Sequence, residues 1–353
     1  MTRTRFHRLA VLGAERVAAD GSAVALTCAV PPSLREAFAF RPGQHVTVRA
    51  TGDDGGELRR SYSVCSTPAD LAGRGHLRLG VRIVPGGAVS GSLADADALD
   101  VLPPVGAFGT TPDPDRRRRY GAVAAGSGIT PILSIVDSVL RTEPFSTFTV
   151  YYANRTTDSA MFTEELADLK NAHARRLHLV HVFSREERPA GLAPGRLDAA
   201  TLPRLLAGLG TPAPGREWFV CGPDGLATAA RRTLLDLDVP ARAVHTELFG
   251  LAVRPVPPAA EGGRVRIVHD SRTSTVDMTA AGSILDAALA VRPELPYSCR
   301  TGVCGTCRAR VLSGTVRMSG GFALGADEEA AGFVLTCRAQ PAGDDVTVEF
   351  DAA

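Results

Sequence analysis

Three closely spaced cysteines and a distant fourth are the clearest sign of chemistry in this sequence. Cys299, Cys304 and Cys307 lie in the stretch YSCRTGVCGTCRAR, and Cys337 follows later in the chain. A tetrahedral zinc site usually combines two close cysteine pairs, or one pair with histidines. By contrast, C-x4-C-x2-C with a remote fourth cysteine is a known ligand spacing for a 2Fe-2S cluster. The spacing therefore predicts such a cluster, with a structural zinc knot or an inert cysteine-rich loop as the alternative.

The glycines between these cysteines also favour a cluster. Gly302 and Gly305 let the backbone wrap closely around inorganic sulfide and turn N–H groups towards it. The stretches PYSCRTGVCGTCRARVLSG and LTCRAQP resemble plant-type ferredoxin domains of the β-grasp kind. The resemblance implies that residues 264–353 form a small α+β domain that carries single electrons.

A one-electron cluster needs a donor, and the middle of the chain contains a candidate nucleotide site. The stretch YGAVAAGSGITPILSIVDSVL has the pattern of a strand, a glycine turn and a helix. Gly126 and Gly128 would let a pyrophosphate approach the backbone at the helix N-terminus. Thr130 is a candidate N-cap, and Pro131 suits the first helical position. Because the turn departs from G-x-G-x-x-G, a plain strand-to-helix connection is the alternative.

Two further motifs accompany this turn, RRSYS earlier in the chain and FVCGPDG later. The order R-x-Y-S, G-x-G-I-T-P and C-G-P resembles the ferredoxin-NADP reductase superfamily over residues 5–250. The resemblance implies that the fork-shaped guanidinium of Arg60 binds a flavin phosphate. It also implies that Tyr62 stacks on the isoalloxazine ring and that Ser63 hydrogen-bonds its N5/O4 edge. A solvated surface charge and a barrel aromatic are the alternatives for Arg60 and Tyr62.

The same resemblance implies the rest of the flavin and nicotinamide sites. GGAVS matches a segment that cradles the flavin pyrophosphate, which favours FAD over FMN. Thr130 and Cys221 correspond to positions that flank the nicotinamide, although Cys221 also suits a buried strand. Glu247 would lie near the reacting ring and Phe249 against the flavin face. Ser63, Cys221 and Glu247 are thus the predicted catalytic residues; the remaining predicted cofactor contacts here are Gly86, Gly87, Val89, Ser90, Gly126, Gly128, Pro131, Gly222 and Pro223.

The choice of nicotinamide coenzyme depends on a few polar residues. NADPH carries a 2′-phosphate, which arginine and hydroxyl side chains recognise. Ser184 and Arg185 follow a predicted strand directly, as in relatives that use NADPH, and Arg155 is a third candidate. These residues favour NADPH. NADH remains the alternative, because Arg185 also belongs to the charged run at 185–188.

The elements that must position these residues form three blocks. Residues 1–111 contain short alternating apolar runs between turns, which predicts an antiparallel β-barrel that binds FAD. Residues 112–250 alternate apolar strands with helical patterns, which predicts a parallel α/β sheet that binds the nicotinamide coenzyme. Prolines and glycines at 251–263 predict a linker before the ferredoxin domain, so the fold class is multidomain. The expected helices span residues 131–140, 161–170, 226–237 and 283–291.

The composition excludes several functional classes. A formal charge of +1 gives no reason to expect nucleic acid as a partner. No apolar run is long enough for a membrane span, and the N-terminal stretch lacks the apolar segment of a secretory signal. Seven cysteines, an odd number, argue against a disulfide framework. We therefore expect a protein of the reducing cytoplasm.

The module order resembles the reductase components of bacterial oxygenases. It implies electron transfer from NADPH through FAD and the 2Fe-2S cluster to a di-iron oxygenase. The stretches AAGSGITPILSIV and FVCGP resemble the reductases of phenylacetyl-CoA epoxidases, which act in phenylacetate catabolism, most strongly. Reductases of arene or ketosteroid hydroxylases are one alternative. A free-standing flavin reductase and a non-catalytic iron–sulfur scaffold are the others.

Overall fold

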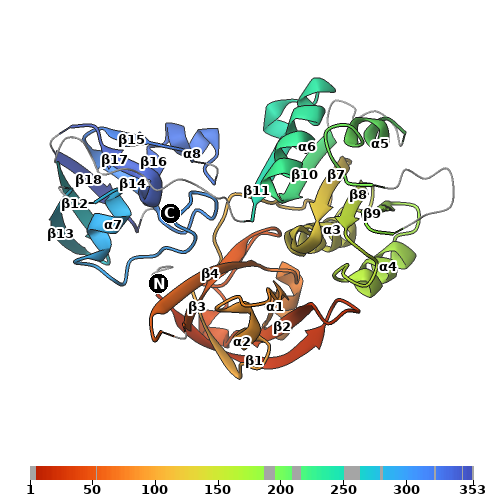
Figure 1. Cartoon of the computed structure of the whole chain (residues 1–353), viewed down its shortest axis with the longest axis horizontal. Helices are drawn as coiled ribbons and strands as arrows, with labels where there is room; N and C mark the ends of the chain where they lie inside the picture. Colours follow the sequence, from red (N-terminus) through yellow and green to blue (C-terminus); the bar gives the residue numbers. More distant parts are fainter. Residues whose placement is uncertain are drawn as a thin grey trace.

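The computed structural model describes residues 5–52, 54–186, 195–208, 216–249, 263–278, 281–321, 323–343 and 345–351. Within these ranges the chain builds one sheet-based module after another, in the predicted order (Figure 1). Residues 251–262 of the predicted linker lie outside the described ranges. None of the described helices is long and apolar enough to cross a membrane.

The first module is a six-stranded antiparallel sheet with strand order β4-β3-β6-β1-β2-β5. Alternate side chains of its strands, such as Val46 and Val48, fill one apolar core, as the period of two predicts. A bridge between Val64 and Leu79 brings the two edge strands together and closes the sheet. The strands are β1 (His7–Arg16), β2 (Ala23–Ala29), β3 (His45–Thr51), β4 (Glu57–Ser63), β5 (His76–Arg82) and β6 (Ala98–Val101), with helices η1 (Pro32–Leu34), α1 (Pro68–Arg74) and α2 (Ser90–Leu93).

The second module is a five-stranded parallel sheet with strand order β11-β10-β7-β8-β9. Helices α3 and α4 share an apolar cluster with one face of the sheet, and α5 and α6 share another with the opposite face. This is the predicted α/β layer structure. The elements are β7 (Arg119–Ala125), η2 (Gly126–Gly128), α3 (Ile129–Thr142), β8 (Thr147–Asn154), α4 (Thr163–Ala172), β9 (Leu177–Phe183), α5 (Leu202–Gly208), β10 (Arg216–Gly222), α6 (Asp224–Asp236), η3 (Ala241–Ala243) and β11 (Val244–Leu248).

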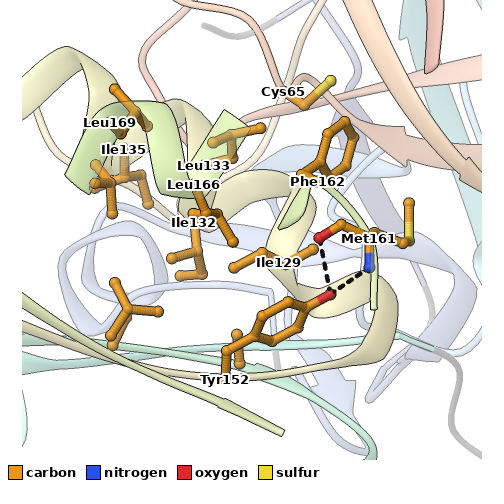
Figure 2. Packing of buried hydrophobic residues seen from close by; sticks show 14 of the residues in the cluster. Cys65, Ile129, Ile132, Leu133, Ile135, Tyr152, Met161, Phe162, Leu166 and Leu169 are labelled. Atoms are coloured by element: carbon orange, nitrogen blue, oxygen red, sulfur yellow. Dashed lines mark hydrogen bonds between the residues drawn. The ribbon is translucent and has the colours of Figure 1, made fainter. Parts of the chain in front are cut away.

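The first two modules share one hydrophobic core, part of which is shown in Figure 2. Cys65 comes from the β-barrel, and it lies in the same cluster as Ile129 and Leu133 of α3. The hydroxyl of Tyr152 accepts a hydrogen bond from Met161 N at 3.0 Å and donates to Met161 O at 3.3 Å. Because the core is continuous, the two modules hold a fixed arrangement at their shared surface.

The third module is a mixed five-stranded sheet with strand order β13-β12-β18-β14-β16, accompanied by the two-stranded pair β15-β17. Strands β12 and β18 pair in parallel, and the other pairs are antiparallel. This agrees with the α+β fold expected for a ferredoxin domain. The elements are β12 (Arg264–His269), β13 (Arg272–Asp277), α7 (Ile284–Leu289), β14 (Arg308–Ser313), β15 (Val316–Met318), α8 (Ala326–Ala330), β16 (Phe333–Leu335), η4 (Thr336–Arg338), β17 (Ala339–Pro341) and β18 (Asp345–Glu349).

The start of α3 differs from the prediction. Thr130 was expected as the N-cap, but the helix begins at Ile129, directly after the turn η2. The hydroxyl of Thr130 donates to the carbonyl oxygen of Ser127 at 2.9 Å, so it does not cap the N–H groups of the first turn. The prediction of an N-cap is therefore wrong. Pro131 is the third helical residue, where a missing backbone N–H costs no helical hydrogen bond.

Candidate flavin, nicotinamide and iron–sulfur sites

The four predicted cluster cysteines converge in the third module as two pairs. A side-chain interaction between Cys304 and Cys299 lowers the pKa of the Cys299 thiol and raises the pKa of Cys304 well above its usual value. An interaction with Cys337 likewise raises the pKa of Cys307, so the four thiols form two neighbouring pairs. Within the described ranges, no three or more His, Cys, Asp or Glu side chains surround a single point in the manner of a one-metal site. Two separate thiol pairs fit a binuclear cluster, which takes four thiolates in all.

The backbone around these thiols has the conformation that the glycines predicted. Gly302 and Gly305 have φ values of 83° and 70°, a region that residues with a Cβ rarely adopt. The N–H of Thr301 donates to Cys299 Sγ at 3.4 Å, so a main-chain donor points at a predicted ligand sulfur. Arg300 and Arg308, which flank the cysteines, form ion pairs inside the module with Asp286 and Glu328.

The R-x-Y-S motif lies at the end of β4, where one polar atom lacks a partner. Ser63 is 3% exposed, and its hydroxyl has no hydrogen-bond partner among the described residues. Buried hydroxyls are normally hydrogen-bonded, so this one fits a ligand that accepts or donates a hydrogen bond. Tyr62 is half-buried, and burial raises the pKa of its phenol to about 12. Arg60 is exposed, and its guanidinium donates to the carbonyl oxygen of Arg59 at 2.9 Å.

The other two predicted catalytic residues lie side by side on adjacent strands of the second module. Cys221 of β10 is in register with Glu247 of β11, and its thiol donates to the Glu247 carboxylate with an Sγ to Oε2 distance of 3.8 Å. Both side chains are buried. Burial raises the pKa of the Cys221 thiol well above its usual value, and the Glu247 charge raises it further. The thiol is therefore neutral at physiological pH.

A histidine that the sequence analysis missed connects this pair to the flavin motif. His45 of β3 lies opposite Ser63 in the strand register, and its Nδ1 lies 3.6 Å from Glu247 Oε1. Its Nε2 is buried and has no hydrogen-bond partner in the described part of the chain. His45 thus brings the three predicted catalytic residues to one place between the first two modules. Its place in the sequence, in an unremarkable PGQHV stretch, gave no signal of that role.

The glycine turn of the second module packs against β10 without space for a side chain. A Cβ on Gly128 would lie 2.2 Å from the carbonyl oxygen of Cys221. The first module also approaches closely, because a Cβ on Gly80 would lie 2.4 Å from Thr130 Cγ2. The turn, the start of α3, Cys221, Gly222 and Pro223 therefore lie together at the edge of the sheet that faces the flavin module.

The remaining predicted contacts lie around this centre. In the GGAVS turn, Gly86 has a φ of 70°, and the Ser90 hydroxyl accepts a hydrogen bond from Val84 N at 3.0 Å. A Cβ on Gly87 would lie 2.9 Å from Val84 O, and Val89 is buried. Phe249 follows β11 and is 38% exposed, so its ring is available to a ligand.

The predicted 2′-phosphate residues are neighbours at the carboxyl ends of β8 and β9. The N–H of Arg185 donates to the carbonyl oxygen of Arg155 at 2.9 Å. Ser184 N donates to Asn154 O at 3.0 Å, so the two strand ends run side by side. All three predicted side chains, those of Arg155, Ser184 and Arg185, are exposed. Residues 187 and 188 of the charged run lie outside the described ranges.

Arg59 is the second functional candidate that the sequence analysis missed. Although Arg60 beside it is exposed, Arg59 is only 4% exposed and contacts the third module. Its Nη1 donates to Leu295 O at 2.8 Å and its Nη2 to Pro293 O at 3.3 Å. Strand alternation distinguishes Arg59 from Arg60, but no pattern in the sequence indicates that another module covers that face.

A cavity of about 450 Å³ lies apart from these residues, in the seam between the first two modules. Its walls come from β2, β5, α1, α3, α4 and the residues between β4 and α1, and they include none of the predicted site residues. Charged groups on its surface neutralise one another, since Arg78 pairs with Glu165 at 2.7 Å and Arg141 pairs with Asp137. Cys65, also in its wall, has a pKa raised to about 12 by burial, which makes the thiol unreactive.

Comparison with protein families agrees with the three modules. Residues 13–111 match the oxidoreductase FAD-binding domain, and residues 122–232 match the oxidoreductase NAD-binding domain. Residues 267–342 match the 2Fe-2S iron-sulfur cluster binding domain, and this range includes all four predicted ligand cysteines. The predicted fold classes and the FAD and 2Fe-2S cofactors are confirmed. The comparison shows a nicotinamide coenzyme but does not distinguish NADPH from NADH.

Similar proteins share the whole length of the chain. One component of the 1,2-phenylacetyl-CoA epoxidase of Escherichia coli (strain K12) is 42% identical, with 99% of each chain covered. The ferredoxin reductase component of 3-ketosteroid-9-alpha-monooxygenase from Rhodococcus rhodochrous is 32% identical, with 91% of each chain covered. The solved structure of phthalate dioxygenase reductase has the same fold, with a TM-score of 0.58, 22% identity and 98% of each chain covered. The chain therefore belongs to the family of NAD(P)H-dependent reductases that carry FAD and a 2Fe-2S cluster and serve oxygenase systems.

Proposed function

We propose that this chain is the reductase component of a phenylacetyl-CoA epoxidase, and that it takes electrons from NADPH. The observation that carries the proposal is the 42% identity to a component of such an enzyme over 99% of both chains. The ketosteroid monooxygenase reductases match less of the chain at lower identity, which makes them the second candidate. The partner would then be a di-iron oxygenase, which takes electrons from the cluster in the cytoplasm.

The flavin would be held by the first module. When bound, FAD accepts two electrons from a nicotinamide and releases them one at a time to the cluster. Arg60 would bind its phosphate, Tyr62 would cover one ring face, and the unpartnered hydroxyl of Ser63 would hydrogen-bond the ring edge. The turn of Gly86, Gly87, Val89 and Ser90 would hold the pyrophosphate with backbone N–H groups. The exposed ring of Phe249 would cover the flavin until the nicotinamide enters.

The nicotinamide would lie between the start of α3 and the end of β10. Gly126, Gly128, Thr130 and Pro131 would border the coenzyme at the helix start, where backbone N–H groups favour a phosphate. Cys221 would contact the nicotinamide ring as a neutral thiol, because burial and the Glu247 charge raise its pKa. Glu247 would fix the positions of Cys221 and His45, both of which it contacts. Gly222 and Pro223 would leave the backbone free to approach the ring.

The preference for NADPH would come from the two exposed arginines at the ends of β8 and β9. Arg155 and Arg185 lie on neighbouring strand ends, where Arg185 N donates directly to Arg155 O, and Ser184 directly precedes Arg185. Two guanidinium groups and a hydroxyl are a suitable set for a 2′-phosphate.

We also propose the domain limits 1–111, 112–250 and 264–353, with 251–263 as the linker.

The partner can be tested by reconstitution. The purified reductase is mixed with the oxygenase component of a phenylacetyl-CoA epoxidase, and product formation from phenylacetyl-CoA is followed with NADPH. We expect turnover that depends on both proteins. A parallel mixture with the oxygenase component of a ketosteroid monooxygenase should give little turnover. Equal or better turnover with the ketosteroid oxygenase would favour the second candidate, and NADPH oxidation unaffected by either oxygenase would favour a free-standing flavin reductase.

A further inference from the structure

We propose that the outer face of the β3–β4 hairpin is a docking surface for the ferredoxin module, and that Arg59 is the residue that positions this module to receive electrons from the flavin. Figure 1 shows the C-terminal module, in blue, next to these strands. The inference depends on the FAD and 2Fe-2S chemistry of the family, and it does not depend on which oxygenase is the partner.

The docking surface follows from strand alternation. Val46 and Val48 point into the barrel core, so the residues between and beside them point outwards. The antiparallel register places His45 opposite Ser63, Thr47 opposite Ser61, and Arg49 opposite Arg59. These three successive rows of the outer face run from the predicted flavin edge towards the turn of the hairpin.

The middle row contacts the cluster loop on both sides. The hydroxyl oxygens of Thr47 and Thr306 lie 3.1 Å apart, and Thr47 is fully buried. The hydroxyl oxygens of Ser61 and Ser298 lie 2.9 Å apart. Ser298 directly precedes Cys299, and Thr306 directly precedes Cys307, so each contact stands next to a ligand from a different thiol pair. The two contacts thereby fix both ends of the cluster relative to the hairpin.

The last row supplies the strongest attachment. The guanidinium of Arg59 donates to Glu57 within its own strand at 2.7 Å, and to the carbonyl oxygens of Leu295 and Pro293 in the ferredoxin module. It also lies 4.0 Å from the ring centre of Tyr297. A buried guanidinium keeps its charge, so these partners are needed to offset its lost hydration. If the ferredoxin module separated from the hairpin, Arg59 would lose the carbonyl groups of Leu295 and Pro293 and the ring of Tyr297 together.

The distance between the flavin edge and the cluster loop is set by the hairpin itself. Ser63, the predicted flavin contact, and Ser61, the contact to the cluster loop, are alternate residues of one strand, about 7 Å apart. Arg59 is one further step along the same face. Because Arg59 contacts the loop at 293–297, it holds the cluster at a fixed distance from the flavin edge. Its role is positioning, since its hydrogen bonds go to a carboxylate of its own strand and to two carbonyl groups of that loop.

The test uses the full-length protein with both cofactors and the variant Arg59→Ala. Rapid mixing with NADPH under anaerobic conditions follows flavin reduction and cluster reduction separately by their absorbance. We expect flavin reduction within about twofold of the unchanged protein, and cluster reduction slowed about tenfold or more, because small misplacements of reacting groups are costly. Hydrogen–deuterium exchange of the 293–307 segment, measured without NADPH, should become about fivefold faster as the docking contacts are lost.

Two further variants keep the result interpretable. Arg8→Ala removes an exposed arginine of β1, which lies outside the β3–β4 hairpin and pairs with Asp100 of the first module, and it should change neither cluster reduction nor exchange. The double variant Thr47→Val with Ser61→Ala tests the middle row if Arg59→Ala folds poorly, and it should give the same separation of the two rates. Unchanged cluster reduction in both docking variants, or equal slowing of flavin and cluster reduction, would overturn the proposal. Exchange needs no electron transfer, so a failure of docking remains distinguishable from a wrong assignment of the oxygenase.

Discussion

Thr47 and Ser61 face each other across the β3–β4 hairpin, and the hydroxyl of each contacts a residue that directly precedes a predicted cluster cysteine. One step further along the same strands, His45 faces Ser63, and His45 contacts Glu247 beside Cys221. A single two-stranded element therefore touches the predicted nicotinamide site, the predicted flavin edge and the cluster loop. The contacts to the predicted nicotinamide site and the predicted flavin edge share one row of the hairpin, and the contacts to the cluster loop follow in the next row.

The first prediction concerns the buried carboxylate at the nicotinamide site. Glu247→Gln removes the charge that Cys221 and His45 share, so the groups around the nicotinamide lose their fixed positions. We expect flavin reduction by NADPH, followed by absorbance after rapid mixing, to slow by about ten- to hundredfold.

Glu217 provides the matched control for that variant. It also lies in the parallel sheet and contacts a histidine, with 3.0 Å between Glu217 Oε1 and His245 Nε2, but it is at the other end of β10. Glu217→Gln should leave flavin reduction unchanged. Equal rates of flavin reduction in Glu247→Gln and Glu217→Gln would show that Glu247 does not contribute specifically to the reaction.

The second prediction concerns the pH dependence of stability. Burial raises the pKa of Cys28 and of Cys65 from 9.0 to about 12, and it raises the pKa of Cys221 as well. Above the usual thiol pKa the unfolded chain has lost these protons and the folded chain has kept them. The free energy of unfolding should therefore fall as pH rises beyond about 9, by about 1.4 kcal/mol per pH unit for each thiol.

Urea unfolding on both sides of the usual thiol pKa measures this effect. Cys28→Ala removes one of the three buried thiols. The slope of the free energy of unfolding against pH should therefore lose about one third of the part that the thiols contribute, by the same linkage argument. A slope that is identical with and without Cys28 would contradict the prediction.

The third prediction concerns the coenzyme. Arg185→Ala removes one of the two arginines at the proposed 2′-phosphate site and should raise KM for NADPH by about ten- to hundredfold, as expected for a charge-assisted hydrogen bond. KM for NADH should stay the same, because NADH has no phosphate there. Arg232→Ala on the exposed face of α6 is the control and should change neither value. If Arg185→Ala weakened both coenzymes equally, the arginine would not read the 2′-phosphate.

The fourth prediction concerns the contact between the glycine turn and β10. Gly128→Ala would place a Cβ 2.2 Å from Cys221 O, so the turn and the strand must separate. We expect a loss of about 1–3 kcal/mol in the free energy of unfolding, together with weaker coenzyme binding. Gly225→Ala, in α6, has no atom within 4 Å of the new Cβ and should be neutral or slightly stabilising. Similar effects of the two substitutions on thermal unfolding would count against a tight contact at Gly128.

Much of the architecture could be predicted from the sequence because local patterns determine it. Alternating apolar runs predicted β3 and β4, helical spacing predicted α3, and cysteine spacing predicted a 2Fe-2S domain. The prediction of an N-cap at Thr130 was wrong, because α3 begins at Ile129, directly after the turn η2. His45 and Arg59 escaped prediction for a different reason: their partners, Glu247 and Leu295, come from other modules. Contacts between modules leave no periodic signal in a single sequence.

The most direct test of the account is the electron paramagnetic resonance spectrum of the anaerobic protein after addition of NADPH. We predict that a reduced 2Fe-2S signal appears in the unchanged protein and in Cys28→Ala, because electrons pass through the flavin to a cluster held by the four cysteines. The signal, together with iron and acid-labile sulfide, should be absent from Cys337→Ala. A flavin that becomes reduced while an intact cluster stays oxidised would contradict the account.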